Sequence, residues 1–477
     1  MKKTLFFTTI ILCFIVLNSF SANTFIRWGS TGNPLTGLTV TWKNTGTTDQ
    51  IKWGLTNSYE KGTFTPAKRT AYSGNFFDYT FPTMTPSTTI HYQIYDSSTS
   101  TWSSELTYQT STTDPANNNF SFLVLGDSRD NMTVWQTVAN LAKSKNTDFG
   151  LFSGDVVGNS GTGTLWDSWF SSGTNLLSKK LIYHCEGNHD SDVNGNEATF
   201  LTQFILPNNK QYYTFNYGNA VFIVLNSEAP TNTTQLSWLK TTLAANTNKM
   251  WKVVMFHKPF YTIGTHAADM TSYKSTWWKA FDDYGVDVIF NGHDHMYERS
   301  KPINLNVSTS SPVSSYGSGS TQGRCQIVCG GSGAPLYTGT ITNMIEKYSS
   351  TYHFCKINIT GNTLTDSTYD STGKLIDTFV LSKSPTGISQ PLQTFNQIDV
   401  IPNPNNGQFQ LKYISEQTGK INLLVSDLNG KIVKRLVADK SGSEFNYNLS
   451  LKNLPKGLYS AEVCLNYQTD HALFIVK

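Results

Sequence analysis

FLVLGDSRD, at residues 122–130, joins an apolar run to a cluster of charged side chains, and four blocks of the same design follow it. They are GLFSGDVV (150–157), IYHCEGNHD (182–190), VVMFHKP (253–259) and VIFNGHDH (288–295). The apolar runs predict buried strands, so each polar group lies where a strand ends and a loop begins. In open sheets this edge is where functional residues collect.

The polar residues of these blocks are of the types that bind metal ions in hydrolases. A single Gly-Asp after a strand is more often a turn, and a single buried histidine is usually a hydrogen-bonded core residue. Five blocks in register favour a two-metal hydrolase instead. We expect six metal ligands: Asp127, Asp155, Asn188, His257, His293 and His295.

Two ions about 3.5–4 Å apart need an anionic bridge, and a carboxylate with two oxygens can supply it. We assign this bridge to Asp155. Asp127 and His295 then complete the first site, and Asn188, His257 and His293 complete the second. Neighbouring groups must fix the histidine tautomers, and Asp294 is one candidate.

His189 directly follows Asn188 in the third block. We predict that His189 protonates the leaving alkoxide or steadies the transition state, with Asp190 orienting its ring. The alternatives are a further metal ligand and a purely structural histidine.

The regions on either side of the blocks differ from them in pattern. Residues 23–112 hold short alternating runs, such as IHYQIY (90–95), separated by Gly, Asn, Thr and Pro, which is typical of a β-sandwich. Residues 395–477 hold turn signals such as Asn429–Gly430 and predict a small all-β sandwich.

The region between these two, residues 118–383, alternates strands with stretches of helical spacing at 131–145, 233–245 and 271–284. This alternation predicts an α/β domain. A chain of 477 residues is long enough for about three such domains.

Residues 1–22 begin with MKK and continue with a short apolar stretch and small residues, which is typical of a signal peptide. The apolar stretch is shorter than the roughly 20 residues that span a bilayer, so we expect an exported chain without a transmembrane segment. The formal net charge is +3, and loss of Lys2 and Lys3 leaves +1. Without a block of like charges, a nucleic-acid partner is not expected.

The cysteines are few, and five remain after the predicted signal peptide. Cys325 and Cys329 lie four residues apart in an apparent strand, roughly 13 Å from each other, so they cannot bridge. An odd and sparse set argues against a disulfide scaffold, although one bridge from Cys355 to this neighbourhood stays open.

The order GD, GD, GNHD, H and GHDH resembles the calcineurin-like metallophosphoesterases, and the layout is most similar to their purple acid phosphatase branch. The resemblance covers nearly all of residues 23–383, and CGGSGAPLY (329–337) is similar to the family's glycine-rich strand end. It implies a fibronectin-III-like or Ig-like β-sandwich, followed by two mixed sheets flanked by helices. It also implies two metal ions (iron, zinc or manganese) and a phosphate monoester substrate, attacked by metal-bound hydroxide with His189 as general acid.

Two positions depart from the family pattern. Gly158 stands where the purple enzymes carry a tyrosine, which removes the reason for colour and weakens the case for ferric iron. Arg129 stands where other metallophosphoesterases place a histidine, so the first ion would be weaker or more exchangeable. Arg129 either holds the phosphate with two hydrogen bonds or forms a surface ion pair. His266 lies where the purple enzymes often place a substrate-facing histidine; simple solvation is the alternative.

The C-terminal region resembles the sorting domain of proteins exported by the bacterial type IX secretion system. The resemblance rests on PNPNNGQF (402–409), the DLNGK turn (427–431), LPKGLY (454–459) and the closing IVK. It implies a secreted or cell-surface bacterial protein that has this machinery as a partner. An ordinary β-sandwich spacer is the alternative.

Two other functions stay open. A phosphodiesterase or nucleotidase on the same scaffold would differ in its loops and in the role of Arg129. A surface binding protein with a degenerate catalytic domain would account for the two flanking β modules. Against it, all six ligand positions and His189 hold competent residues.

Overall fold

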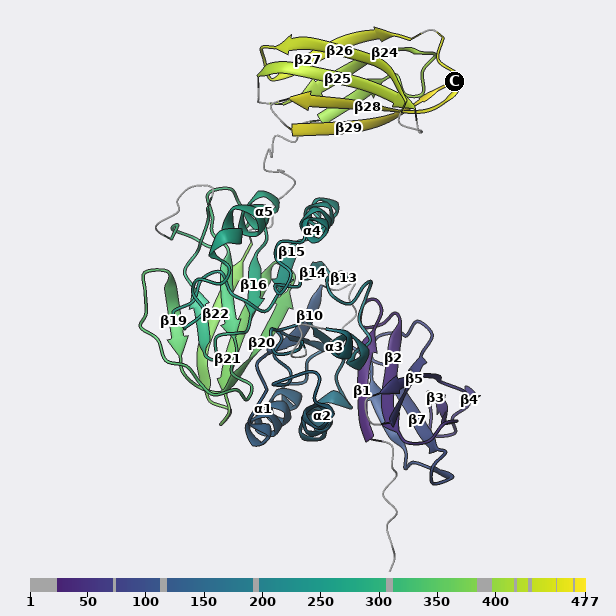
Figure 1. Cartoon of the computed structure of the whole chain (residues 1–477), viewed down its shortest axis with the longest axis vertical. Coiled ribbons are helices and arrows are strands. Elements are labelled where there is room, and N and C mark those ends of the chain that lie inside the picture. The colour runs from purple at the N-terminus through teal and green to yellow at the C-terminus, as the bar shows by residue number, and fades with distance from the viewer. Residues whose placement is uncertain are drawn as a thin grey trace, which may run out of the picture. The chain divides into compact units, whose positions relative to one another are not determined.

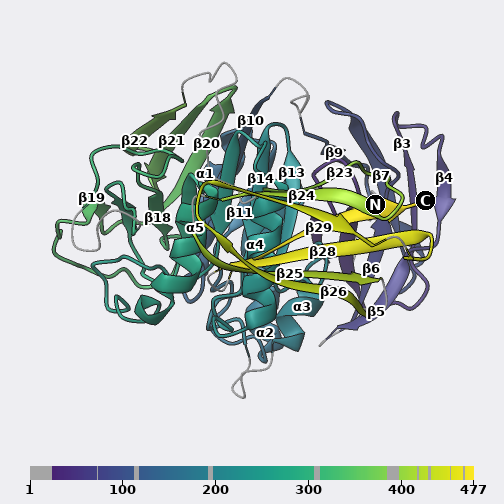
Figure 2. The same cartoon turned by 90° about the horizontal axis from the view of Figure 1, so that it is seen from above.

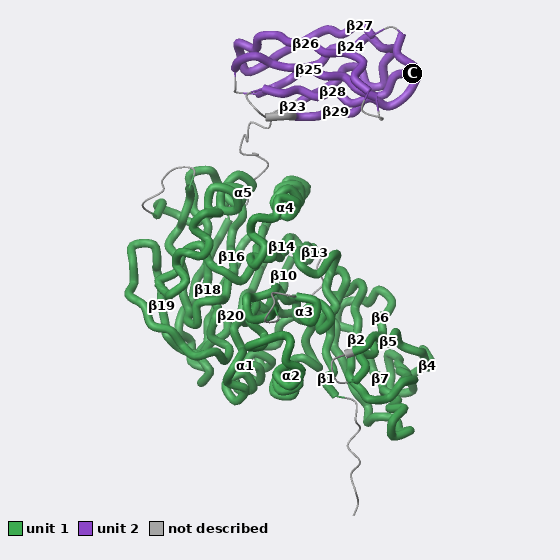
Figure 3. Tube along the Cα trace, viewed as in Figure 1, with its two compact units in different colours: residues 1–385 green, residues 386–477 purple. Residues whose placement is uncertain are grey.

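The computed structural model describes residues 24–71, 74–111, 118–191, 197–305, 312–383, 397–415, 418–427, 431–451, 453–465 and 468–477. The chain forms two compact units, residues 1–385 and 386–477 (Figure 3). The expected signal peptide at 1–22 lies outside the described residues.

The N-terminal part of the first unit consists of two antiparallel sheets. One contains β1 (Thr24–Ser30), β2 (Leu38–Asn44), β6 (Gly74–Thr80) and β5 (Ala67–Ala71) in that order. The other contains β4 (Gly62–Phe64), β3 (Gln50–Gly54), β7 (Thr89–Asp96), β8 (Thr101–Trp102) and β9 (Leu106–Gln109). Alternate residues of β7 are buried, as expected for a strand with one face toward a core.

The central part contains two mixed sheets. The first has the order β12 (Ile182–His184), β11 (Phe149–Phe152), β10 (Asn119–Leu125), β20 (His353–Thr360), β21 (Thr363–Asp370) and β22 (Leu375–Ser382). The second has the order β13 (Tyr213–Tyr217), β14 (Ala220–Val224), β15 (Trp251–Met255), β16 (Val288–Asn291), β18 (Cys325–Cys329), β17 (Tyr297–Ser300) and β19 (Ile345–Ser349). Strands β14, β15, β16 and β18 are parallel neighbours, so the ends of β15 and β16 face one edge of the sheet.

Helices lie on both outer faces of this pair of sheets (Figure 1). α1 (Met132–Ser144) and α2 (Gly163–Leu177) lie on one side, and α4 (Thr233–Ala245) and α5 (Lys279–Tyr284) lie on the other. Strand β14 shows why both faces are apolar. Phe222 belongs to the core between the two sheets, whereas Val221 and Ile223 pack in the core beneath α4 and α5.

The short helix α3 (Ala198–Gln203), α2 and the N-terminal sheets pack against one another. The indole Nε1 of Trp28 donates to the Ser178 carbonyl oxygen at 3.1 Å, and Arg27 Nε donates to the Gln203 carbonyl oxygen at 2.8 Å. Lys43 forms an ion pair with Asp167 on α2 at 2.7 Å. Both views show β3, β4 and β7 on the side of the unit opposite to β19 (Figures 1 and 2).

The second unit is an all-β sandwich. Its smaller sheet contains β23 (Gln397–Ile401), β24 (Gln408–Ile414) and β27 (Glu444–Ser450). Its larger sheet contains β26 (Ile432–Lys440), β25 (Gly419–Asp427), β28 (Gly457–Leu465) and β29 (Gln468–Val476). Among the helices that the structure describes, none has the length and apolar character to cross a bilayer.

The cysteine arrangement agrees with the spacing argument. Cys325 and Cys329 do not bridge, and the described cysteines are all free thiols. Cys355 of β20 lies with its sulfur 3.5 Å from that of Cys329 on β18, so the two sheets meet at this pair.

Candidate metal centre

The five sequence blocks meet at one edge of the paired sheets. Asp127 follows β10, Asp155 follows β11 and Asn188 follows β12, while His257 follows β15 and both His293 and His295 follow β16. Two overlapping groups of potential ligands result: Asp155, His257 and His293, and Asp127, Asp155 and His295. Asp155 belongs to both groups, which is the position expected of a bridging carboxylate.

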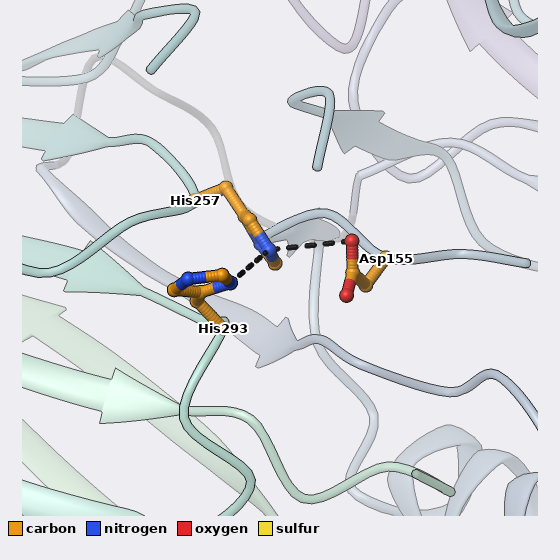
Figure 4. A group of neighbouring side chains, drawn as sticks. All are labelled: Asp155, His257 and His293. Atoms are coloured by element: carbon orange, nitrogen blue, oxygen red, sulfur yellow. Dashed lines mark hydrogen bonds and ion pairs between the residues drawn. The ribbon is translucent and has the colours of Figure 1, made fainter. Parts of the chain in front are cut away.

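In the second site, three potential ligand atoms lie close to His257 Nε2, and Figure 4 shows the contacts with Asp155 and His293. Asp155 Oδ1 is 3.2 Å from it, Asn188 Oδ1 is 3.0 Å from it and His293 Nδ1 is 3.1 Å from it. The aspartate and both histidines are buried, whereas Asn188 is exposed. The site is therefore a buried pocket of ligands that is open to solvent at Asn188.

In the first site, His295 Nε2 lies 3.7 Å from Asp127 Oδ1, and both side chains are buried. Backbone amides hold the carboxylates of the centre. The His293 amide donates to both oxygens of Asp127 at 3.0 and 3.1 Å, and the His189 amide donates to Asp155 Oδ1 at 3.0 Å.

Each ligand histidine is oriented by a contact at its other ring nitrogen. His257 Nδ1 contacts the Ser153 carbonyl oxygen at 2.8 Å, and His295 Nδ1 contacts the Pro335 carbonyl oxygen at 2.7 Å. His293 Nε2 contacts Asp269 Oδ2 at 3.0 Å. Because the second nitrogen donates in each case, the nitrogen that faces the centre keeps its lone pair for a metal.

The proposed tautomer role of Asp294 is wrong in this structure. Asp294 Oδ1 contacts His266 Nδ1 at 2.8 Å, and Asp294 Oδ2 accepts from the Thr262 hydroxyl at 2.6 Å. Two of the groups that orient the ligand rings are backbone carbonyls, which every residue carries and which no sequence motif marks. Asp269 also has no signal in the sequence, because it lies in an irregular loop.

The backbone at the ligands adopts conformations that side-chain-bearing residues rarely adopt. Asp127, Asp155 and His293 have φ of 55°, 53° and 71°. A non-glycine residue in this left-handed region costs roughly 1–3 kcal/mol and persists where the surroundings enforce it. Gly187 shows how tightly the loops pack, since a Cβ there would lie 2.3 Å from Asp155 Oδ1.

The electrostatics of the centre favour a bound cation. Burial, followed by the charge of Asp155, raises the pKa of the Asp127 carboxyl well above its usual range. Burial acts in the same direction on Asp155, but nearby His257 and His189 lower its pKa overall. Burial also lowers the pKa of His293, and it lowers that of His295 to about 4. The imidazoles of His293 and His295 are therefore neutral at pH 7, the form in which histidine binds metals.

His189 lies at the edge of the centre, half-buried, with Nδ1 3.0 Å from the Gly158 carbonyl oxygen. The expected orientation of His189 by Asp190 is wrong. The buried Asp190 accepts hydrogen bonds from the amides of Val156 and Val157 through Oδ1, and from the Gly187 amide through Oδ2. Asp190 therefore ties two ligand loops together.

The two expected substrate-binding residues both lie at the centre. The Arg129 side chain is 15% exposed, pairs with Asp130, and also places Nε 3.4 Å from Asp155 Oδ2. The His266 ring packs against His293 with a centroid distance of 3.9 Å. Tyr337, within the glycine-rich block but not assigned a role from sequence, stacks on His295 at 4.2 Å.

Known proteins resemble both parts of the chain. Residues 120–297 match the family described as Calcineurin-like phosphoesterase, and residues 399–477 match the Secretion system C-terminal sorting domain. Purple acid phosphatase 15 of Arabidopsis thaliana is 32% identical over 163 residues, which is 31% of this chain and 31% of that protein. Phosphoenolpyruvate phosphatase of Allium cepa is 26% identical over 205 residues, 39% of this chain and 42% of that protein. The chain spans less than half the length of these relatives.

The fold has solved counterparts. A purple acid phosphatase from yellow lupin (Lupinus luteus) seeds superposes with a TM-score of 0.66 at 18% identity, covering 76% of this chain and 75% of that chain. PhoD superposes with a TM-score of 0.53 at 13% identity, covering 77% of this chain and 94% of that chain. Together these matches confirm the predicted resemblance and the predicted fold class. The sorting domain indicates a secreted or cell-surface bacterial protein.

Proposed function

We propose that this chain, whose central domain is a purple acid phosphatase-like metallophosphoesterase, is a secreted phosphatase that hydrolyses phosphate monoesters at a pair of metal ions. The observation that carries the proposal is the position of Asp155. This one carboxylate belongs to two separate groups of buried ligands, so two ions would share it.

The donor set fits such a pair of ions. Asp155, Asn188, His257 and His293 would hold one ion, and Asp127, Asp155 and His295 would hold the other. Mixed carboxylate, imidazole and amide donors suit iron, zinc or manganese. Two ions held in this way supply a Lewis acid for the phosphoryl oxygens and a nucleophile from water at neutral pH.

His189 is the proposed proton donor to the leaving oxygen. Because its Nδ1 is held by the Gly158 carbonyl, Nε2 is the ring atom left to carry and release a proton. The hydrogen bond from His189 to Asp155 comes from the backbone amide, so the ring is not needed for this contact.

Arg129 and His266 are the proposed contacts for the phosphate and its ester group. The guanidinium offers paired N–H donors that match a phosphate, and it lies beside Asp155. His266 is 30% exposed in its side chain and lies over His293, at the solvent side of the second site. An ester would therefore enter past Asn188 and His266.

The experiment is elemental analysis of the purified mature protein, combined with hydrolysis of a chromogenic phosphate monoester and of the matching diester. We expect at least one tightly bound ion per chain, preferential monoester hydrolysis and no violet absorption band, because Gly158 offers no phenolate. Faster diester turnover would favour the phosphodiesterase or nucleotidase alternative. Less than one ion per chain, with no hydrolysis in added zinc, manganese or iron, would favour the alternative of a surface binding protein with a degenerate catalytic domain.

A further inference from the structure

Arg129 approaches the same donor atoms that the first metal site needs. Its Nε lies 3.4 Å from Asp155 Oδ2, and its Nη2 lies 3.4 Å from His295 Nε2. The other oxygen of Asp155 faces His257 in the second site at 3.2 Å. One oxygen of the proposed bridging carboxylate therefore faces the ligands of the second site, and the other faces the guanidinium of Arg129.

Arg129 pairs with Asp130, and Asp130 lies next to Gly158. Asp130 forms an ion pair with Arg129 and has a left-handed backbone with φ of 76°. A Cβ at Gly158 would lie 3.3 Å from Asp130 Oδ1, a separation tight enough to require an adjustment. The two departures from the family pattern are therefore neighbours in space, since the Asp130 carboxylate that holds Arg129 lies against the glycine.

The guanidinium and a metal ion would draw on one lone pair. His295 donates from Nδ1 to the Pro335 carbonyl, so its Nε2 lone pair is the one presented to the centre. An ion at the usual distance of about 2 Å from this nitrogen would take that lone pair away from the arginine N–H. The first site also has three protein donors in these contacts, whereas the second has four.

The positive charge of Arg129 also disfavours a metal ion in the first site. The first site contains two carboxylates, Asp127 and Asp155, and the guanidinium already supplies one compensating positive charge. A second cation placed within a few ångströms of Arg129 would be repelled in this buried setting, where charges are poorly screened.

We infer that Arg129 makes the two metal sites unequal, so that the first site fills only weakly until a phosphate group binds the guanidinium. This inference rests on the proposed two-ion phosphatase. Arg129 Nε is buried and has the ion-pair contact with Asp155 but no hydrogen bond to the described residues, so a phosphate oxygen would give this donor a hydrogen bond. The same phosphate adds negative charge beside the first site and offsets the repulsion.

The test is calorimetric titration of metal-stripped full-length protein with Zn²⁺, without and with inorganic phosphate, together with ion counting after equilibrium dialysis. In the wild type we expect one tightly bound Zn²⁺ and a second that binds at least roughly tenfold more weakly. We call the ratio of these two affinities the gap, and we expect phosphate to narrow it. In Arg129→Gln the gap should already be narrow when no phosphate is present. Added phosphate should then change the affinity of the second ion much less than it does in the wild type. Arg129→Lys, which keeps the charge, should keep the second ion weak.

Lys258→Gln is the matched control. It removes one positive charge next to His257, but Lys258 pairs with Glu228 and not with a donor of the first site. We expect this variant to leave the affinity of the weakly bound ion, and its response to phosphate, at the wild-type values. Two equally tight ions in the wild type, or an unchanged gap in a folded Arg129→Gln protein, would overturn the inference. Absence of any tight ion in all variants would overturn the proposed function instead.

Discussion

At the scale of single residues, His189 offers the sharpest test of the chemistry. His189→Ala keeps the backbone amide that donates to Asp155, so metal content should be unchanged. The rate should fall by roughly 10²–10⁴ because general acid catalysis is lost. The fall should be larger for an alkyl phosphate than for a nitrophenyl phosphate, whose leaving group needs no proton.

Steady-state rates with both esters, and ion counting on the same preparation, check this prediction. Loss of an ion in His189→Ala would make His189 a ligand, which is the alternative considered from the sequence. An equal fall for both esters would argue against proton transfer to the leaving oxygen.

Substitution of Asp269 should weaken only the tightly bound ion, the one held by the second site. Its carboxylate holds His293 Nε2 at 3.0 Å, and such partners typically change metal affinity by about 10–100-fold. Asp269→Asn should therefore weaken the tight ion by this factor while the protein stays folded. The control is Asp283→Asn, since Asp283 is a similarly exposed aspartate that pairs with Lys279 on α5. Equal Zn²⁺ affinity in the two variants would contradict the role given to Asp269.

The residues that could be predicted from sequence share one property. The six expected ligands and His189 each follow a buried strand, and strand ends are visible as the point where an apolar run stops. Asp130 and Asp269 could not be assigned, because their effects arise from contacts with Arg129 and His293 that only the folded loops create. The ligand roles themselves stay predictions until a metal is measured.

At the scale of elements, the composition of α2 hides the helical spacing of its buried residues. Its sequence, GTLWDSWFSSGTNLL, is rich in Gly, Ser and Thr and does not suggest a helix by propensity. The buried residues Trp166, Trp169, Phe170 and Gly173 nevertheless follow helical spacing. Gly173 lets α2 approach α1, since a Cβ there would lie 2.8 Å from the Trp135 ring. Tertiary packing therefore decides this helix.

Strand β21 carries a buried acid whose titration should affect folding. Burial, followed by the nearby Cys329, raises the pKa of Asp366 to about 8, whereas an unfolded aspartate titrates near 4. Between these values the folded state keeps a proton that the unfolded state releases. Stability from this group is thus complete below about pH 4 and declines as pH rises toward 8, by roughly 1.4 kcal/mol per unit.

Asp366→Asn should remove this decline, because an amide cannot ionise. Urea unfolding of wild type and variant at pH 5, 6.5 and 8, followed by tryptophan fluorescence, measures the difference. The free energy of unfolding of the wild type should fall relative to the variant as pH rises. A constant difference across the three values would show that Asp366 does not titrate in this range.

At the scale of the whole molecule, the two units should unfold separately, while the N-terminal sheets and the central sheets should unfold together. Trp28 is 4% exposed and reaches the Ser178 carbonyl, and Lys43 pairs with Asp167. These contacts join the N-terminal sheets to the central part. Their partners could not be predicted, since Trp28 and Lys43 appear in the sequence as ordinary strand residues.

A chain that ends at residue 385 should therefore keep the melting temperature and the hydrolytic rate of the first unit. It should also stay inside the producing cell, because the sorting domain at 399–477 is gone. Calorimetry, ester hydrolysis and fractionation of the culture test the three statements. By contrast, Trp28→Ala should lower the stability of the first unit by about 3–5 kcal/mol. A truncated chain that melts earlier than the full chain would show that the units support each other.

The left-handed conformations of Asp127, Asp155 and His293 have a consequence for laboratory evolution. Glycine would relax the backbone at each of these three positions, so selection for heat tolerance alone would enrich glycine substitutions there. Each substitution would remove a side chain that the centre needs. Heat-hardened descendants of this protein should therefore be screened for turnover at each round.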